Sequence, residues 1–589
     1  MLKGKKEIIF VCLISVVLSF IIYGNGIKGG FVFDDSVVIE KRSGDLLRNP
    51  ILSFFAAPYH QRSPHSGLFR PLPVVSYALE YRMLGSKPWH FHVVNILLHS
   101  FNAVLAYLLL FKLSKNEKLA SLAALLFLFH PIHTEAVTSI VGRAELLAFF
   151  WAVLAAIVSL RGFGLLEAGA FFLALLSKES ALAVLPILIF IKRWRLNLPW
   201  SAVWRKSVYL APALAVYFLL RYLALGEYMF KSGVVNFIEN PLKFLPLAER
   251  LGTAFKVLSL YVLKLLWPVH LSADYSYSSF GFVNMTSVSA LLGLAILAVS
   301  VAVLWKKRRG WLAVGIAFFF FPYLLISNLA LTTGTVMAER LMYLPSLGFL
   351  AVLSYAALGL AGRRKTLLWA AAGVMLVWYG YLVFDRNKDW FSDEKIFTAA
   401  ERLHPDSMIP RVALAAIDMQ NEKWAEAKHE LDRAVSIYSG YSPLQNLLGV
   451  WAGHSGDQKA AEGYFIKSAE LNPKSINPRV NLANLYIKQK QYQKALEHLV
   501  VLVELNPARD FAVKYGYLLI AAGKSNEAIS VANKYLSTND AEYFSILGTA
   551  YFNNKDYIRA LEYLLKAKQY GKSDPAIDEM INMAGNKIP

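Results

Sequence analysis

The chain has little cysteine and little charge. Cys12 is its only cysteine, so no disulfide can form within the chain, and cysteine usage says nothing about the compartment. Only 17% of the 589 residues are charged while 56% are hydrophobic, and the mean hydropathy is +0.41. This composition excludes an ordinary soluble enzyme and predicts that part of the chain lies in lipid.

Nucleotide-binding motifs are also lacking. The sequence has no phosphate-cradling glycine loop, no dinucleotide fingerprint and no serine-nucleophile elbow in a suitable context, which disfavours nucleotide-driven chemistry. The net charge is +20, and residues 1–384 carry all of it, with 36 Lys and Arg against 16 Asp and Glu. Because the basic clusters lie between apolar segments, they predict membrane topology and no binding to nucleic acid.

Apolar runs of spanning length are concentrated in residues 1–384 and predict a polytopic helix bundle. We expect about eleven spans, the first of which is a retained signal anchor. They are 8–23, 89–113, 118–134, 142–160, 162–177, 180–192, 205–225, 286–305, 311–330, 341–361 and 366–384. Segment 251–269 carries Lys256 and Lys264 on one helical face, so we expect it to lie in the membrane interface without crossing.

Basic residues also predict the orientation of the bundle. With the basic clusters on the cytoplasmic side, including Lys306 to Arg309 and Arg363 to Lys365, the amino terminus lies inside. The first loop, 24–88, and everything after 384 then lie on the non-cytoplasmic side. The membrane would be the cell membrane of a bacterium or archaeon, or the endoplasmic reticulum in a eukaryote.

From residue 385 the sequence predicts a second domain, 385–589, built from about five repeats of two helices each. Small residues twelve positions apart recur at a period of 32 to 34 residues. The pairs are Ala415 and Ala427, Gly449 and Ala461, Ala483 and Ala495, Gly516 and Ala528, and Gly548 and Ala560. This is the tetratricopeptide pattern, which predicts an α-solenoid whose groove binds an acceptor protein or peptide.

Ionisable residues gather at the expected external border of the bundle, where a charge near hydrocarbon is costly unless it is paired or used. We expect these side chains to converge on one outward-facing cavity; the alternative is that each caps a helix or snorkels. They are Asp34, Asp35, Arg70, His130, His133, Glu135, Arg143, Glu145, Lys178, Glu179, Asp274, Glu339 and Arg340.

Three groups within this set suggest chemistry. A low-dielectric setting would raise one pKa of the pair Asp34 and Asp35, which makes a general base plausible; a turn pair is the alternative. His130, His133 and Glu135 have the spacing of metal ligands, but no set completes a tetrahedral site, so imidazoles that bind a phosphate or a sugar hydroxyl are favoured. Arg340 and Lys178 could clamp a phosphate, unless each simply pairs with its neighbouring acid.

The order of motifs carries a resemblance to a known family. FDD (33–35), FRPL (69–72), WHFHVVNILLH (89–99), HPIHTEAV (130–137), GRAELLA (142–148), SKES (177–180), LSADYS (271–276) and ERLMYLPSLGF (339–349) precede the repeats. In this order the chain resembles the transmembrane-and-tetratricopeptide-repeat O-mannosyltransferases, which are GT-C glycosyltransferases. The resemblance covers nearly the whole chain and implies an all-α, GT-C-like membrane domain followed by the solenoid.

The resemblance implies a membrane enzyme that moves a monosaccharide, mannose or a similar hexose, from a polyprenyl-phosphate carrier to a hydroxyl of an exported protein or glycan. By carry-over, Asp34 or Asp35 is the base, and Arg340, Lys178 and Arg70 hold the donor phosphate. The remaining border residues, His130, His133, Glu135, Arg143, Glu145, Glu179 and Glu339, would shape the sugar and acceptor pocket. No cofactor is required, and a divalent cation is allowed.

Two other functions fit the pattern. One is a non-catalytic membrane-anchored scaffold, whose repeats gather envelope proteins and whose border residues are structural. The other is a transporter, which is disfavoured because residues 1–190 and 200–384 show no internal symmetry.

Overall fold

The computed structural model describes residues 5–60, 66–230, 235–279, 281–506, 508–572 and 574–588. Within these ranges the regular elements are helices, and no strand is found. The chain divides into two compact units, 1–413 and 414–589. The all-α prediction is therefore confirmed. The segment 385–413 packs with the first unit, although the repeat pattern predicted that the second domain begins at 385.

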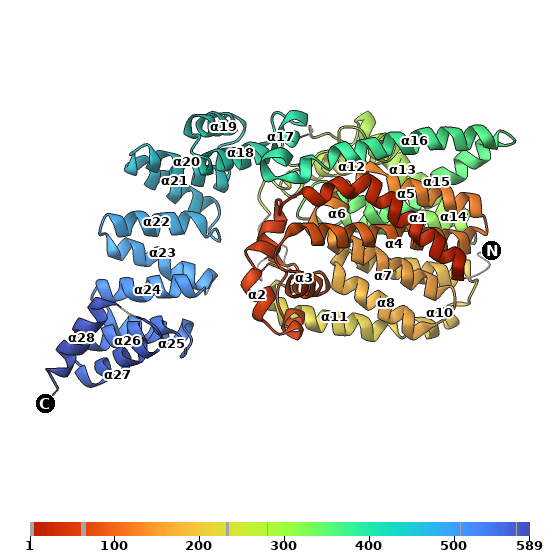
Figure 1. Ribbon diagram of the computed structural model, residues 1–589. Helices are drawn as coiled ribbons and strands as arrows, with labels where there is room; N and C mark the ends of the chain where they lie inside the picture. The colour runs from red at the N-terminus through yellow and green to blue at the C-terminus, as the bar shows by residue number, and fades with distance from the viewer. Residues whose placement is uncertain are drawn as a thin grey trace. The chain divides into compact units, whose positions relative to one another are not determined.

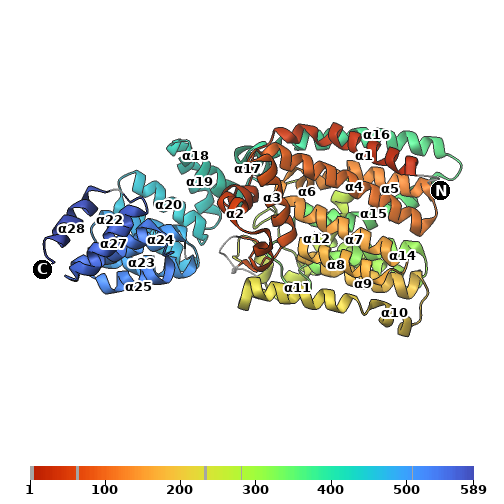
Figure 2. The same ribbon diagram turned by 60° about the horizontal axis from the view of Figure 1, so that its bottom comes forward.

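The first unit is a bundle of long apolar helices with short helices at one end (Figures 1 and 2). Its helices are α1 (Lys5–Tyr23), α2 (Ser43–Arg48), α3 (Pro71–Leu84), α4 (Pro88–Ser114), α5 (Glu117–Phe129), α6 (Thr134–Thr138), α7 (Arg143–Ser159), α8 (Gly164–Ser177), α9 (Val184–Phe190), α10 (Trp200–Ser207), α11 (Leu210–Leu225), α12 (Leu247–Leu266), α13 (Val288–Lys306), α14 (Trp311–Ile326), α15 (Tyr343–Ala361), α16 (Lys365–Arg386) and α17 (Asp393–Leu403).

Fewer helices could cross a membrane than the sequence predicted. In the described part of the chain, seven are long and apolar enough, or eight if α5 and the bent segment 131–138 form one span. Two more, α8 and α14, are apolar but shorter. The expected span 180–192 consists of three short pieces, η7 (Glu179–Ala183), α9 and η8 (Ile191–Arg195). The expected count of about eleven therefore exceeds the number of helices that could each cross alone.

Helix α12 is 20 residues long but is not among the helices apolar enough to cross. One of its faces is buried and packs along α13. Its Lys256 donates a hydrogen bond to the carbonyl of Gly281 (2.7 Å), and Lys264 donates to that of His270 (2.9 Å). Both lysines thus bind loop carbonyls, and a position of α12 in the membrane interface stays a prediction.

The two ends of the bundle differ in the way the topology predicts. In Figures 1 and 2 the start of α1, helix α10 and the turn between α15 and α16 all lie at one end. Helices α2, α3 and α17 lie at the opposite end. The first loop, with the acidic pair at 34–35, is therefore at the end away from the basic turns.

The first loop is folded against the bundle. It contains η2 (Ser36–Glu40), α2, η3 (Ile51–Ala56) and α3. Their apolar side chains form a small core with Phe91 of α4 and with Ile140. A loop with its own buried core can hold polar side chains at fixed positions.

The segment after the last long helix braces this loop. The backbone N–H of Gly30 donates to the carbonyl of Phe391 (3.1 Å). The backbone N–H of Phe33 donates to Asp393 Oδ1 at the start of α17 (2.7 Å), and the Phe33 ring packs edge-on against Phe397 of α17 (5.6 Å between centroids). The first loop and α17 are thus parts of one structure.

The second unit consists of helix pairs followed by a single last helix. They are α18 (Met408–Gln420) with α19 (Trp424–Ile437), α20 (Ser442–His454) with α21 (Gln458–Leu471), α22 (Asn477–Lys488) with α23 (Tyr492–Leu505), α24 (Arg509–Ala521) with α25 (Ser525–Tyr535), α26 (Ala541–Asn553) with α27 (Tyr557–Gln569), and α28 (Pro575–Gly585). Each predicted pair of small residues lies on the two helices of one repeat. A Cβ on Gly449 would lie 2.5 Å from Phe465, so these helices approach too closely for a larger residue.

A close approach of α14 and α15 in the first unit gives a testable prediction. A Cβ on Gly348 of α15 would lie 2.1 Å from the carbonyl oxygen of Gly315, whereas one on Gly359 of the same helix would meet nothing within 4 Å. Gly348→Ala must separate the helices, and we expect it to destabilise the protein by about 1–3 kcal/mol. Gly359→Ala should be neutral or stabilise by up to about 1 kcal/mol. Thermal unfolding of the detergent-solubilised variants measures both; equal melting temperatures would refute the close packing.

Candidate functional site

Asp34 follows a residue with an unusual backbone. Phe33 has φ +57°, a left-handed conformation that costs energy in a non-glycine residue and persists only where neighbours hold it. The contacts of Phe33 with Asp393 and Phe397 supply that support. Asp34 itself is half-buried, and no described residue makes a hydrogen bond or ion pair with its carboxylate. Its oxygens are therefore available to another molecule.

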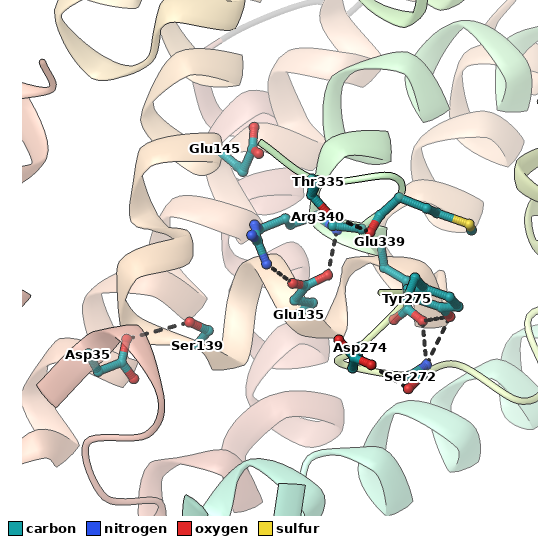
Figure 3. Close-up of polar contacts among 12 residues, drawn as sticks. Asp35, Glu135, Ser139, Glu145, Ser272, Asp274, Tyr275, Thr335, Glu339 and Arg340 are labelled. Carbon is teal, nitrogen blue, oxygen red and sulfur yellow. Dashed lines mark hydrogen bonds and ion pairs between the residues drawn. The ribbon is translucent and has the colours of Figure 1, made fainter. Parts of the chain in front are cut away.

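Asp35 points into the protein. It is 1% exposed and accepts hydrogen bonds from the backbone N–H groups of Val32 (3.3 Å), Ile140 (3.3 Å) and Val141 (2.8 Å), and from the Ser139 hydroxyl (3.4 Å). Burial raises the pKa of Asp35 to about 7, although these N–H groups oppose the shift. Asp35 thus joins the first loop to the turn before α7 (Figure 3).

Arg340 and Glu135 form the centre of the site. Both the backbone N–H and Nη1 of Arg340 donate to the Glu135 carboxylate, the first at 2.8 Å. Glu135 is 1% exposed, whereas the Arg340 side chain is 33% exposed. Nε and Nη2 of Arg340 make no hydrogen bond with a described residue. Glu135 therefore orients a guanidinium that keeps free donors for a further anion.

Two more ion pairs lie in this region. Lys178, which follows α8, pairs with Glu145 on α7, and both side chains are nearly buried. Arg70 donates from Nε and Nη2 to the Glu179 carboxylate, at 2.9 and 2.5 Å, and its guanidinium lies 5.2 Å from the centre of the Tyr59 ring. Burial alone would raise the pKa of Glu179, but the charge and hydrogen bonds of Arg70 bring it down to about 2.

Electrostatic interactions join these groups into one cluster. The charges of Asp34 and Glu145 both act on Arg340, and Glu145 also acts on Arg70. In Figure 3 the Arg340 guanidinium points between Glu135 and Glu145, toward the side on which Asp35 lies. Six of the predicted residues thus form three ion pairs that interact with one another, and Asp34 lies within electrostatic range of one of them, Arg340. The six are Arg70, Glu135, Glu145, Lys178, Glu179 and Arg340.

Glu339, next to Arg340, points the other way (Figure 3). Its carboxylate accepts from the hydroxyl of Tyr275, from the backbone N–H of Ser272 (2.7 Å) and from Arg386 (3.0 Å). Glu339 is fully buried, so it fixes the loop 268–276 against the end of α16.

Asp274 belongs to this second network. It accepts hydrogen bonds from the hydroxyls of Ser276 (2.9 Å) and Ser407, and burial raises its pKa although these hydroxyls oppose the shift. Glu339 and Asp274 thus join the loop 268–276 to Arg386 and Ser407.

Three predicted residues are bound by other protein groups. His130 uses both ring nitrogens, toward the carbonyl of Leu265 and the N–H of Ile132, and His133 bonds the carbonyl of Phe127 and the Ser346 hydroxyl. Both rings are fully buried. Arg143, also fully buried, is consumed by Glu80 (2.6 Å), Asn95, Ser76 and the carbonyl of Phe91. Their geometry fits a structural role better than the predicted sugar pocket.

In the part of the chain that the structure describes, no three His, Cys, Asp or Glu side chains are grouped so as to hold a metal ion. The ring nitrogens of His130 and His133 are already occupied by protein partners.

Several supporting residues were not predicted from the sequence. Asp393 and Phe397 position Phe33, Tyr275 and Arg386 hold Glu339, and Glu80 neutralises Arg143. The sequence did carry a signal for Arg386 and Glu80, because each is a charged residue beside an apolar run and such a charge needs a partner. The role of Asp393 depends on a contact across 360 residues, and no local pattern encodes that.

Comparisons with known proteins agree with the motifs. A tetratricopeptide-repeat family model matches residues 477–509. The human protein O-mannosyl-transferase TMTC3 is 24% identical over 87% of this chain and 56% of its own length. The Caenorhabditis elegans protein O-mannosyl-transferase F38B6.6 is 27% identical over 74% of this chain and 64% of its own. The solved structure of the tetratricopeptide protein YrrB covers 33% of this chain and all of its own, at 22% identity and a TM-score of 0.29.

The chain spans 56 and 59% of the length of the human and mouse TMTC3 proteins. Those two relatives and the worm protein come from animals, so they lend no support to a bacterial or archaeal membrane. The resemblance predicted from the motifs is nevertheless confirmed: over most of its length, this chain is similar to TMTC protein O-mannosyl-transferases.

Proposed function

We propose that the protein transfers a hexose, mannose in the first instance, from a polyprenyl-phosphate carrier to a hydroxyl group of a protein. The observation that carries this proposal is the half-buried Asp34 carboxylate, free of protein partners and within electrostatic range of Arg340. The names of the relatives support transfer of mannose to protein. The polyprenyl-phosphate donor is supported by the position of the cluster at one end of a bundle of apolar helices, where a lipid carrier can present its phosphate.

In the proposed reaction Asp34 is the general base. The acceptor hydroxyl gives its proton to the Asp34 carboxylate while its oxygen attacks the anomeric carbon of the sugar. The bond between that carbon and the phosphate oxygen breaks, and the carrier leaves as a polyprenyl phosphate with one more negative charge. Asp35 is a positioning residue, because its oxygens are taken by the backbone of residues 32, 140 and 141.

The growing charge on the leaving phosphate requires cations that are fixed before the reaction. Arg340 has two free nitrogens and is partly exposed, so we assign it the main contact with phosphate. Arg70 and Lys178 are each paired with one acid, which leaves part of their hydrogen-bonding capacity for the phosphate as well.

The repeats are assigned the role of holding the acceptor protein, on the non-cytoplasmic side with the cluster. A non-catalytic scaffold would need no unpaired carboxylate within electrostatic range of an arginine that keeps donors free, so the geometry favours the enzyme. The first prediction below separates the two functions.

Asp34→Asn should reduce transfer of mannose by about 10²- to 10⁴-fold, because the amide cannot take the proton from the acceptor. The measurement is transfer from polyprenyl-phosphate mannose to an acceptor protein by the reconstituted full chain. The control is Glu40→Gln, which removes an exposed acid of the same loop and should leave the rate unchanged. Unchanged transfer by Asp34→Asn would refute the role of base, and absence of transfer by the unsubstituted chain with any lipid-linked sugar would favour the scaffold.

Removing the phosphate contact requires two substitutions. Arg340→Gln alone would leave the buried Glu135 unpaired and could prevent folding. The double variant Glu135→Gln/Arg340→Gln removes both charges and should fold, yet raise the KM for the lipid donor at least about tenfold. Arg340→Lys keeps the charge and loses the paired donors of the guanidinium, so its KM for the lipid donor should lie between those of the unsubstituted protein and the double variant. Unchanged donor KM in the double variant would contradict the assignment.

The raised pKa of Asp35 predicts that the stability of the protein depends on pH. Its pKa of about 7 in the folded protein lies above the ordinary aspartate value of 3.8, so the folded state binds the proton more tightly, and stability is lost as pH rises from about 4 to 7. Asp35→Asn removes this pH-dependent contribution to stability. The melting temperature of Asp35→Asn relative to the unsubstituted protein should therefore increase with pH across that window. A difference that stays constant with pH would contradict the buried carboxyl.

A further inference from the structure

A second polar region lies at the opposite end of the bundle, around α10 and the segment that leads into it. Trp200 and Trp204 of α10 are 45% and 62% exposed, and Val208 and Tyr209 follow at 57% and 44%. Trp200 and Trp204 stack at 6.1 Å, and Trp194 meets Trp200 edge-on at 5.9 Å. Exposed tryptophans beside apolar helices are typical of the level of lipid headgroups.

Cations surround these rings. The guanidinium of Arg193 lies 5.5 Å from the centre of the Trp200 ring. Arg161, Arg205 and Lys206 form no ion pair with any acid in the described ranges. The acid close by, Glu167, is already paired with Lys192 at 2.9 Å. The region therefore carries more positive than negative charge, because the one acid that lines the cavity, Glu167, already has Lys192 as its partner.

The cations adjoin a small cavity. It has a volume of about 50 Å³ and is lined by Ser159, Gly162, Gly164, Glu167, Lys192, Leu196, Lys206 and Tyr209. This exceeds the space that one water molecule needs, so a small polar group such as a phosphate can enter it. The Lys206 ammonium lies 3.7 Å from the position of a Cβ on Gly162, which places it at the cavity wall.

Buried contacts hold this arrangement in place. The ammonium of Lys192, 2% exposed, donates to the carbonyl of Lys206 and to the Ser207 hydroxyl, both at 3.1 Å. Lys192 thereby ties the end of α10 to Glu167 on α8. The backbone of Lys206 is thus held in place by a buried side chain.

We propose that this region is a binding site for an anionic phospholipid, whose phosphate enters the cavity beside Lys206. Arg205 and Arg161 would face the headgroup, and the tryptophans would lie at the level of the headgroups. A phospholipid fits better than a soluble anion because large apolar side chains of α10 and α11 are also exposed, among them Trp204, Leu219 and Leu223. The site lies at the end away from Asp34, so this proposal does not depend on the proposed transferase activity.

The test compares two double variants, each of which lacks two positive charges, by the phosphatidylserine that they retain. The full chain is reconstituted in vesicles of phosphatidylcholine with or without phosphatidylserine, and the lipids retained after extraction are counted by native mass spectrometry. Arg205→Gln/Lys206→Gln should weaken retention of phosphatidylserine about 10- to 30-fold. Lys306→Gln/Lys307→Gln removes the same number of charges from another basic turn and should leave this retention unchanged.

The other outcomes would overturn the proposal. Equal loss in both double variants would mean general attraction to basic turns, and no loss in either would mean that no such site exists. Equal retention of phosphatidylcholine would remove the requirement for an anionic lipid. Displacement of phosphatidylserine by added inorganic phosphate alone would identify the cavity as a site for a soluble anion.

Discussion

A charge beside hydrocarbon must have a partner, and the first unit depends on this constraint. Five of its buried acids are each paired with a cation from another segment: Glu80 with Arg143, Glu145 with Lys178, Glu167 with Lys192, Glu135 with Arg340 and Glu339 with Arg386. Each pair joins segments far apart in the chain, so the pairs fix which helices are neighbours. Asp34, by contrast, is half-buried, and its carboxylate makes neither a hydrogen bond nor an ion pair with a described residue.

The adjacent residues Glu339 and Arg340 show how one turn serves two purposes. Glu339 is buried and holds the loop 268–276, while Arg340 reaches the opposite side and keeps donors free. The backbone N–H of Arg340 also donates to Glu135, so the backbone that carries the guanidinium is held in place. A rigid cation of this kind can stabilise a developing negative charge without first reorganising.

The sequence predicted the features that depend on composition and period. Small residues twelve positions apart identified the repeats, and the apolar runs identified the long helices. The border charges identified most of the cluster. The sequence could not show which border residues are structural, because histidines and arginines such as His130, His133 and Arg143 are equally common in binding sites. Their partners are backbone carbonyls, amides and acids brought near by folding. The first unit extends to residue 413 for a similar reason, since contacts of the first loop with α17 leave no local pattern.

The bracing of Phe33 by α17 affects how the protein can be divided. A cut after the last long helix would remove Asp393 and Phe397 and leave a left-handed phenylalanine with nothing to hold it. The shortest fragment that keeps Asp34 in place therefore includes the first helix beyond the bundle. The apolar part of the sequence ends with α16, but the contacts that hold Phe33 in place extend into α17.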